Sequence, residues 1–234
     1  MDDYNIFSYE DYKNSSLELK LKKIKLLNEY YKFKKLSKIR VYIDFDGVIL
    51  DTMSIANELL IENHGINIIN NDYISDDEEK EIANFFINLN WKKLLNEADE
   101  INKSKSFIKL IKESNIYEPI IYSAVNSENE KNEKSTFLDR KLKNVEYKFI
   151  AVRNPKICDD RNSIIVDDSD FNLINWYGYP IHFDSKINSI FPTIDDLGEI
   201  YYLFYENKYK EGLYDDFIRE EDVKTKKVTW KKKI

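Results

Sequence analysis

The stretch RVYIDFDGVILDT, residues 40–52, decides how this chain is expected to fold. It begins with an apolar, β-branched run that is typical of a buried strand, and the run ends at Asp44 and Asp46, which are followed by Gly47. Carboxylates at the edge of a hydrophobic core are costly unless something compensates their charge. A divalent cation with a phosphate group is the first candidate, because Mg²⁺ is usually held by one or two carboxylates together with phosphate oxygens.

The composition of the 234-residue chain excludes several classes of protein. A hydrophobic content of 42% with 14% aromatic residues excludes a disordered chain, and the length suits one domain with an elaboration or a second, smaller domain. The net charge of −7 gives no strong signal for nucleic-acid binding. The single cysteine, Cys158, excludes an internal disulfide framework and a multi-cysteine zinc site. The absence of disulfides fits the cytoplasm, where we expect the protein to be.

Two further classes are excluded by local patterns. No apolar stretch approaches the roughly 20 residues that a membrane-spanning helix needs, so we expect no membrane partner. The acidic start MDDYNIFSYE does not have the pattern of a signal peptide. The pattern does not indicate an oligomeric state.

Strand-like and helix-like segments alternate along the chain. Five short apolar runs predict strands: IRVYI, EPIIYS, VEYKFIAV, RNSIIVDD and YPIHF. Helical spacing predicts helices between them, one of which would start at a capping box of Ser75 and Glu78. This alternation predicts an α/β fold with a doubly wound, mostly parallel sheet.

Helices are also predicted at both ends of the chain. The first follows a capping box of Ser15 and Glu18 and runs to about residue 38. The last would start at Pro192 or Thr193, although Gly198 weakens it. The basic end KTKKVTWKKKI is most simply a solvated tail.

Polar side chains follow the predicted strands at the points where the strands end. Asp44 and Asp46 end the first strand, Ser123 ends the second, and Asp167 and Asp168 end the fourth. In parallel sheets ligands bind at the carboxyl ends of the strands, so we expect these groups to meet. A carboxylate can attack phosphorus, Mg²⁺ held by two carboxylates can screen the repulsion, and a lysine and a hydroxyl can hold the remaining oxygens.

At this point the sequence resembles the haloacid dehalogenase-like (HAD) phosphohydrolases. The segment DFDGV matches the first motif of that family, IIYSA the second, Lys134 in NEKSTFLDRKL the lysine of the third, and SIIVDD the fourth. The four motifs occur in the order of the family and span residues 40–170. The resemblance implies a HAD-like Rossmannoid core and a Mg²⁺-dependent phosphatase activity.

The resemblance also implies a role for each matching residue. Asp44 would be the nucleophile that forms an aspartyl-phosphate, and Asp46 the general acid and base. Ser123 and Lys134 would bind the phosphoryl group. Gly47 would turn the chain away from the strand, and it is placed with the phosphate-binding residues.

The same resemblance implies a set of ligands for Mg²⁺. Asp44 and the backbone carbonyl of Asp46 would bind the metal from the first strand. Asp168 is the preferred ligand from the fourth strand, with Asp167 as support for the metal or as a partner of Lys134. Whether or not they bind a metal, Asp167 and Asp168 could also cap the helix that follows the fourth strand.

The long segment between the first two motifs predicts a helical cap. We expect an N-terminal helical extension at 1–38, the core at 39–51 and 106–210, the cap at 52–105 and a C-terminal tail at 211–234. A cap excludes water and supplies contacts to a small substrate. Phe86 and Trp91 are candidates for contacting a base or sugar, although aromatic residues at helical spacing are more often core.

Within the family, the layout is most similar to the 5′(3′)-deoxyribonucleotidases, as EKSTFLDRKL, Arg153 and VDD indicate. These residues make Arg153 a candidate substrate-binding residue and a nucleotide one candidate substrate among small phosphorylated metabolites. The chain departs from those enzymes at DDSDFN, where Ser169 replaces their arginine. A non-catalytic Mg²⁺- or phospho-ligand-binding module and a phosphotransferase remain the alternative functions.

Overall fold

The computed structural model describes residues 9–32, 38–69, 74–152, 154–157, 160–184, 186, 188–205, 217–221 and 228–232. Its centre is a six-stranded parallel sheet in the order β3-β2-β1-β4-β5-β6. The strands are β1 (Ile39–Ile43), β2 (Tyr117–Val125), β3 (Glu146–Ala151), β4 (Ser163–Asp167), β5 (Tyr179–Phe183) and β6 (Thr193–Ile194). The five predicted strands are confirmed, and β6 is an additional short one.

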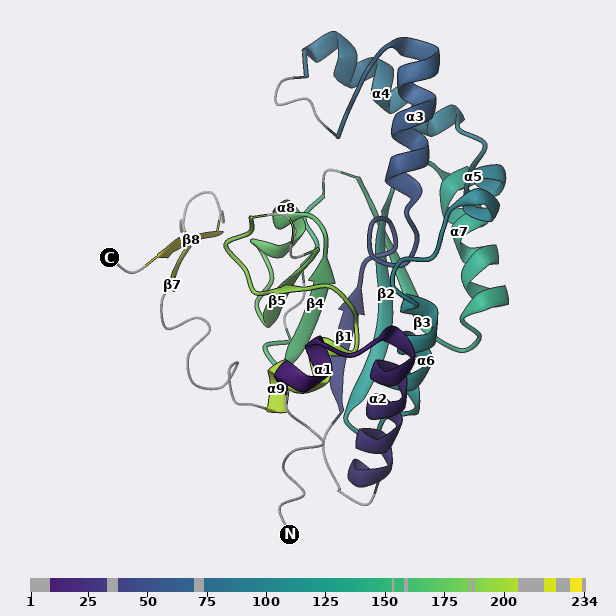
Figure 1. Ribbon diagram of the computed structural model, residues 1–234. Coiled ribbons are helices and arrows are strands. Elements are labelled where there is room, and N and C mark those ends of the chain that lie inside the picture. The colour runs from purple at the N-terminus through teal and green to yellow at the C-terminus, as the bar shows by residue number, and fades with distance from the viewer. Residues whose placement is uncertain are drawn as a thin grey trace.

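Helices lie on both sides of this sheet (Figure 1). They are α1 (Tyr9–Lys13), α2 (Leu17–Tyr31), α3 (Thr52–His64), α4 (Asp76–Asn88), α5 (Trp91–Glu97), α6 (Ser104–Glu113), α7 (Glu128–Lys141), α8 (Asp170–Leu173) and α9 (Glu199–Tyr205). Alternate residues of β1 enter two different apolar layers: Val41 and Ile43 join the larger core, and Tyr42 packs in a second cluster with Leu173 and Trp176. The sheet is therefore buried on both faces, as a doubly wound fold requires.

The chain between β1 and β2 forms the four helices α3 to α6. Asp51 caps the start of α3 by accepting a hydrogen bond from the Ser54 amide at 3.2 Å, and Gly65 ends that helix with a φ of 70°. The predicted capping box of Ser75 and Glu78 is present at the start of α4. In Figure 1, α3 and α4 project beyond the carboxyl ends of the strands.

The prediction for the first helix is wrong at its start. The cap of α2 is Ser16, whose hydroxyl accepts a hydrogen bond from the Leu19 amide at 3.4 Å. Ser15 donates instead to the Asp11 carbonyl, 2.7 Å away, and so closes the short helix α1 that the sequence pattern did not predict. The two helices are separated by only a few residues, so neighbouring serines serve different helices.

The prediction of a helix from Pro192 or Thr193 is also wrong. Thr193 and Ile194 form β6, and α9 begins only at Glu199. The Asp196 carboxylate accepts a hydrogen bond from the Gly198 amide at 3.0 Å, which fixes a turn between strand and helix.

Part of the segment predicted as a solvated tail forms an antiparallel pair, β7 (Phe217–Glu221) with β8 (Val228–Lys232). The β-branched and aromatic residues in VTW favour a strand over an irregular tail. Within the described ranges, the helices are all too short or too polar to cross a membrane.

The N-terminal helices are attached to the core by buried polar contacts. The Tyr12 hydroxyl donates to one oxygen of Asp196 at 2.5 Å, and Lys20 Nζ lies 2.8 Å from the other oxygen. The side chains of Lys20 and Asp196 are 10% and 1% exposed. Burial, and then the charge of Asp196, raise the pKa of Tyr12 above its usual value, so its hydroxyl stays a hydrogen-bond donor. Helices α1 and α2 therefore complete the core.

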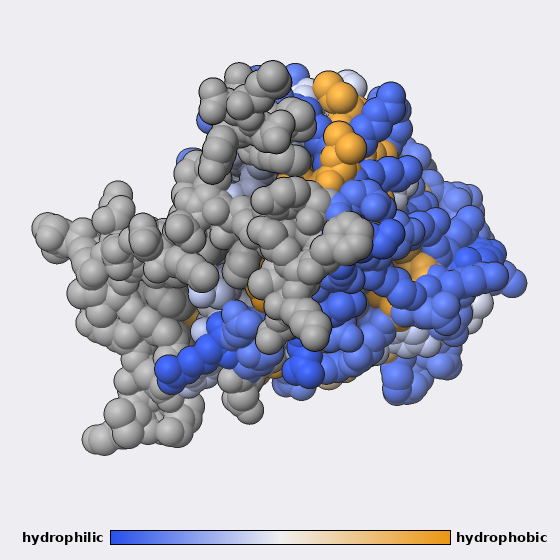
Figure 2. Space-filling model, turned by 90° about the horizontal axis from the view of Figure 1, so that it is seen from below, coloured by the Kyte–Doolittle hydropathy of each residue, from blue (hydrophilic) through white to orange (hydrophobic). Residues whose placement is uncertain are grey.

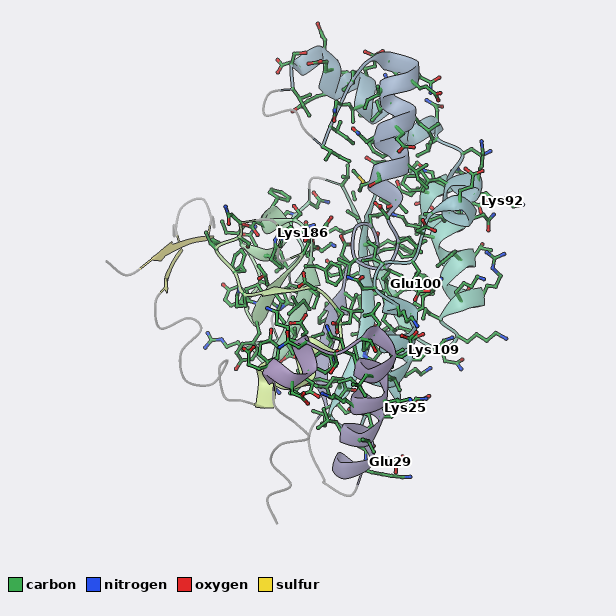
Figure 3. The ribbon with its side chains drawn as sticks, viewed as in Figure 1. Lys25, Glu29, Lys92, Glu100, Lys109 and Lys186 are labelled. Atoms are coloured by element: carbon green, nitrogen blue, oxygen red, sulfur yellow. The ribbon has the colours of Figure 1, made fainter. Side chains whose placement is uncertain are left out.

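The surface outside these contacts is largely polar. Seen from below, the described part of the molecule is mainly hydrophilic, and its hydrophobic side chains form small separate spots (Figure 2). Lys25 and Glu29 are exposed on α2, as are most charged side chains of the outer helices (Figure 3).

Candidate active site

The order of the strands brings the ends of β1 and β4 together. From β1 the chain moves outward to β2 and β3, and it then returns to β4 on the other side of β1. Such a switch point opens a crevice at the carboxyl ends of the two neighbouring strands. The Asp44 amide donates to the Val166 carbonyl at 2.9 Å, which places the residues that end the two strands side by side.

Three carboxylates converge at this switch point. Asp44, Asp167 and Asp168 each offer an oxygen, and these oxygens all lie within 4.8 Å of one another. Burial, followed by the negative charge of Asp167, raises the pKa of Asp44 to about 7. Burial and the charges of Asp44 and Asp167 also raise the pKa of Asp168 well above its usual value. Without a further positive charge, the protein therefore holds these acids at a cost.

Lys156, which the sequence analysis did not select, supplies part of that positive charge. It is fully buried, and its Nζ lies 2.7 Å from Asp44 Oδ1 and 2.7 Å from Asp167 Oδ2. Burial alone would lower the pKa of Lys156, but the charges of the two aspartates outweigh it and raise the pKa. Of the two roles predicted for Asp167, the pairing with Lys134 is wrong, because Lys156 is its partner; its role as support for the metal stays a prediction.

The two aspartates that flank Lys156 differ in their remaining contacts. Asp167 Oδ1 accepts hydrogen bonds from the Ser169 amide and the Asn172 side chain, both at 3.0 Å. Asp44 Oδ1 lies 2.7 Å from Lys156 Nζ and is held by that ion pair. Its other oxygen, Oδ2, accepts no hydrogen bond from the described residues, and the side chain is 9% exposed. Asp167 is held in place, whereas Asp44 keeps an oxygen for another partner.

A second buried lysine, Lys134, lies beside Asp46. Its Nζ makes an ion pair with Asp46 and lies 3.1 Å from Ser123 Oγ and 2.6 Å from Glu130 Oε1. Burial would lower the pKa of Lys134, but the charges of Asp46 and Glu130 raise it, so it stays protonated. The structure therefore brings three predicted residues, Asp46, Ser123 and Lys134, together. Glu130 also contacts Lys134, because it lies one helical turn before it on the same helix.

Asp46 is oriented by groups on three segments. Its Oδ1 accepts a hydrogen bond from the Thr52 hydroxyl at 2.7 Å, and its Oδ2 accepts from Ser123 Oγ at 3.3 Å and from Lys134. Its side chain is 19% exposed, and it lines a cleft together with Asp44 and Asp168. Asp46 is thus fixed in direction and still accessible.

Gly47 has two reasons to be glycine. Its φ is 72°, and a Cβ placed on it would lie 1.9 Å from Asp168 Oδ2. Its amide donates to the Leu50 carbonyl at 2.9 Å within the same turn. The geometry therefore gives Gly47 a role in the turn and in the close approach to Asp168, while its contact with phosphate stays a prediction.

The cleft above the carboxylates has a volume of about 480 Å³ and is closed on one side by the segment between β1 and β2. Phe86 and Trp91 line it, although they are only 8% and 2% exposed. Trp91 also donates from Nε1 to the Phe86 carbonyl at 3.0 Å, and Lys134 Nζ lies 4.9 Å from its ring centre. Both aromatic residues are part of the core and of the cleft wall. Arg153, the other predicted substrate contact, lies outside the described residues.

Comparison with known proteins yields similar structures only. No protein-family model and no curated protein matches the chain. One similar structure is a HAD-superfamily hydrolase of subfamily IA, variant 1, from Geobacter sulfurreducens. The sequences are 13% identical, the match covers 71% of this chain and 100% of that chain, and the TM-score is 0.49. The second, named as a HAD-hydrolase from Bacillus subtilis bound to magnesium, has 14% identity over 72% and 99% of the two chains and a TM-score of 0.44.

The third similar structure is a protein named as a beta-phosphoglucomutase from Bacteroides vulgatus, with 11% identity over 74% and 87% of the two chains and a TM-score of 0.38. At these identities the comparisons describe a likeness of fold and assign no activity.

Proposed function

We propose that this protein is a Mg²⁺-dependent phosphomonoesterase that acts through an aspartyl-phosphate on Asp44. One observation carries the proposal: three carboxylates share a small space at the switch point, and Asp44 lines the cleft there with only one of its oxygens paired, to Lys156, among the described residues. A small phosphorylated metabolite is the proposed substrate, and a 5′-nucleotide is one candidate.

The donor set fits a magnesium ion. Asp44, Asp167 and Asp168 offer only oxygen atoms, which hard divalent cations prefer. Asp168 fits direct binding best, because none of the described residues donates a hydrogen bond to it, whereas both oxygens of Asp167 are occupied, one by Lys156 and the other by Ser169 and Asn172. When bound, the ion would neutralise the cluster and the phosphate oxygens.

Asp44 fits the role of nucleophile better than its neighbours. It lines the cleft, and Lys156 holds one oxygen of its carboxylate, Oδ1, so that Oδ2 is left for the attack. Its attack on phosphorus forms the aspartyl-phosphate bond and breaks the ester bond. The leaving oxygen then takes a proton from Asp46.

Asp46 fits the second half of the reaction as well. After the alcohol has left, its carboxylate takes a proton from water, and the resulting hydroxide attacks the phosphoryl group and restores Asp44. Ser123 and Lys134, which both contact Asp46, are proposed to orient it and to bind the phosphoryl oxygens.

The test is the turnover of para-nitrophenyl phosphate with Mg²⁺ and with a chelator. The wild type is expected to require Mg²⁺, and Asp44→Asn is expected to lose activity by about a hundredfold or more. Asp99→Asn, the same change at an exposed aspartate outside the site, is expected to keep the wild-type rate. Near-normal turnover by Asp44→Asn would refute the assignment.

A second measurement looks for the intermediate itself. Asp46→Asn is expected to slow the attack of water, so the peptide that contains Asp44 should carry a phosphoryl group when the reaction is stopped in acid and analysed by mass spectrometry. Product analysis with added alcohols separates hydrolysis from phosphotransfer. If a broad panel of phosphate esters gives neither turnover nor a phosphorylated peptide, the protein is a binding module.

A further inference from the structure

The wall of the cleft opposite the carboxylates is mainly apolar, and Glu79 is its one charged residue among the described ones. Its residues come mostly from the segment between β1 and β2, and they include Met53, Ile68, Ile74, Ile82 and Phe86. Most of them pack against the hydrophobic core of the protein, so the wall is a fixed surface. A volume of about 480 Å³ falls within the roughly 300–1,000 Å³ of small-molecule sites. A ligand of this cleft is therefore small, and the part of the ligand that contacts this wall has few polar groups.

This wall also brings no positive charge to the cleft. Residues 52–103 contain eleven acidic residues but only four basic ones, all of them lysines. Lys80 and Lys93 line a separate pocket formed by α3, α4 and α5, and Lys103 makes an ion pair with Glu18. Lys92 is exposed and extends away from the molecule (Figure 3). The whole segment thus has no lysine or arginine for an anionic group of a ligand.

The floor of the cleft is acidic. Asp44, Asp46 and Asp168 line it, and none of the described residues lining the cleft is a lysine or an arginine. Lys134 and Lys156 are buried behind these acids and already engaged with carboxylates. The negative charge of one phosphoryl group can be compensated here by a divalent cation. A second anionic group would face mainly acids and apolar side chains among the described residues of the cleft.

We propose that the cleft selects phosphate monoesters whose alcohol part is uncharged and mainly apolar or aromatic, and that it rejects substrates with a second anionic group. This inference rests on the proposed phosphatase function and adds its substrate class. Bisphosphates, phosphorylated carboxylic acids and nucleoside diphosphates are disfavoured, and hydroxyl-rich sugar phosphates find few partners on the apolar wall.

The test compares phenyl phosphate with carboxyphenyl phosphate, two esters that differ by one carboxylate. The kcat/KM of the wild type is expected to be about tenfold or more higher for phenyl phosphate, because the second anion meets like charge without a counter-ion. Ile82→Lys places a cation on the cleft wall and is expected to reduce this ratio by about tenfold. Ile87→Lys, on the exposed side of the same helix, is the matched control and should leave the ratio unchanged.

A variant at a second position guards against misfolding of the first. Ala83→Lys is on the same wall and is expected to change the ratio in the same direction. Equal or faster turnover of carboxyphenyl phosphate by the wild type overturns the proposal. If the wild type turns over carboxyphenyl phosphate well and Arg153→Met does not, Arg153 supplies the positive charge for the second anion. That result overturns the proposal as well.

Binding measurements separate this inference from the phosphatase proposal. Asp44→Asn with Mg²⁺ is titrated with phenylphosphonate and with carboxyphenylphosphonate, which contain no ester bond to cleave. Tighter binding of phenylphosphonate supports the charge selection even if no ester is turned over, and equal binding overturns it. If the wild type turns over no ester while Asp44→Asn shows the binding preference, the phosphatase function alone is refuted.

Discussion

Replacing Asp44 by asparagine is expected to stabilise the metal-free protein above neutral pH, although Asp44 is the residue on which we propose the chemistry to depend. Burial and the charge of Asp167 raise the pKa of Asp44 from 3.8 to about 7, in spite of the opposing charge of Lys156. A carboxyl group with a pKa that is higher in the folded state makes folding less favourable once it is ionised. Asparagine keeps the shape of the side chain and removes that charge.

The sign and size of the effect follow from this shift. The folded state binds the proton more tightly, so the free energy of unfolding falls as the pH rises from 3.8 to about 7, and the full penalty is present above that range. Each pKa unit corresponds to about 1.4 kcal/mol, which sets an upper limit of about 4 kcal/mol. We expect Asp44→Asn to gain about 1–3 kcal/mol at about pH 8 and little at about pH 4.

Urea unfolding followed by tryptophan fluorescence, with a chelator present, measures this difference at both pH values. Asp99→Asn should change stability by less than about 0.5 kcal/mol at either pH. Added Mg²⁺ is expected to stabilise the wild type more than Asp44→Asn, because binding to the folded state alone raises stability. If Asp44→Asn is equally destabilising at both pH values, the carboxylate cluster is not strained and the reasoning fails.

Three other substitutions test the packing around the site. Gly47→Ala is expected to cost about 1–2 kcal/mol from its positive φ alone, and more from the clash with a carboxylate, as a lowered urea midpoint would reveal. Lys156→Met should destabilise the protein by about 3–5 kcal/mol, because it leaves two buried carboxylates without a cation, whereas exposed Lys148→Met should cost less than about 1 kcal/mol in the same assay. Asp196→Asn leaves buried Lys20 without its counter-charge, and its melting temperature should fall by several degrees; an unchanged value would show that the N-terminal helices are not held by this contact.

The sequence was sufficient to predict the parts of the site that follow strand ends. Asp44, Asp46 and Asp167 each follow or end an apolar run that could only be a buried strand, and the rule for parallel sheets then brings them together. Lys134 was predicted through the resemblance of NEKSTFLDRKL to the third HAD motif, in competition with Lys131 and Lys141, and the structure puts it beside Asp46 and Ser123.

Lys156 could not be predicted in this way. It lies in the irregular connection between β3 and β4, where no periodicity fixes the direction of a side chain. Its position depends on the whole sheet, because only the return of the chain to β4 brings it between Asp44 and Asp167. One of the two roles predicted for Asp167, the contact with Lys134, is therefore wrong, because Lys156 makes that contact.

Errors in the helices have local causes. Ser15 and Ser16 are equivalent by pattern, and the unpredicted helix α1 decides which of them caps α2. At the other end, Thr193 pairs with His182 of β5 before any helix can begin, because strand pairing over a long distance prevails over local helical spacing.

Two buried lysines give this site an internal counter-charge. Lys134 lies between Asp46 and Glu130, and Lys156 lies between Asp44 and Asp167, so each pair of acids is partly neutralised by the chain itself. Small zinc domains, by contrast, remain unfolded until their metal arrives. For this protein, newly made chains would not have to wait for a cation before they fold, and metal uptake can follow as a separate, reversible event.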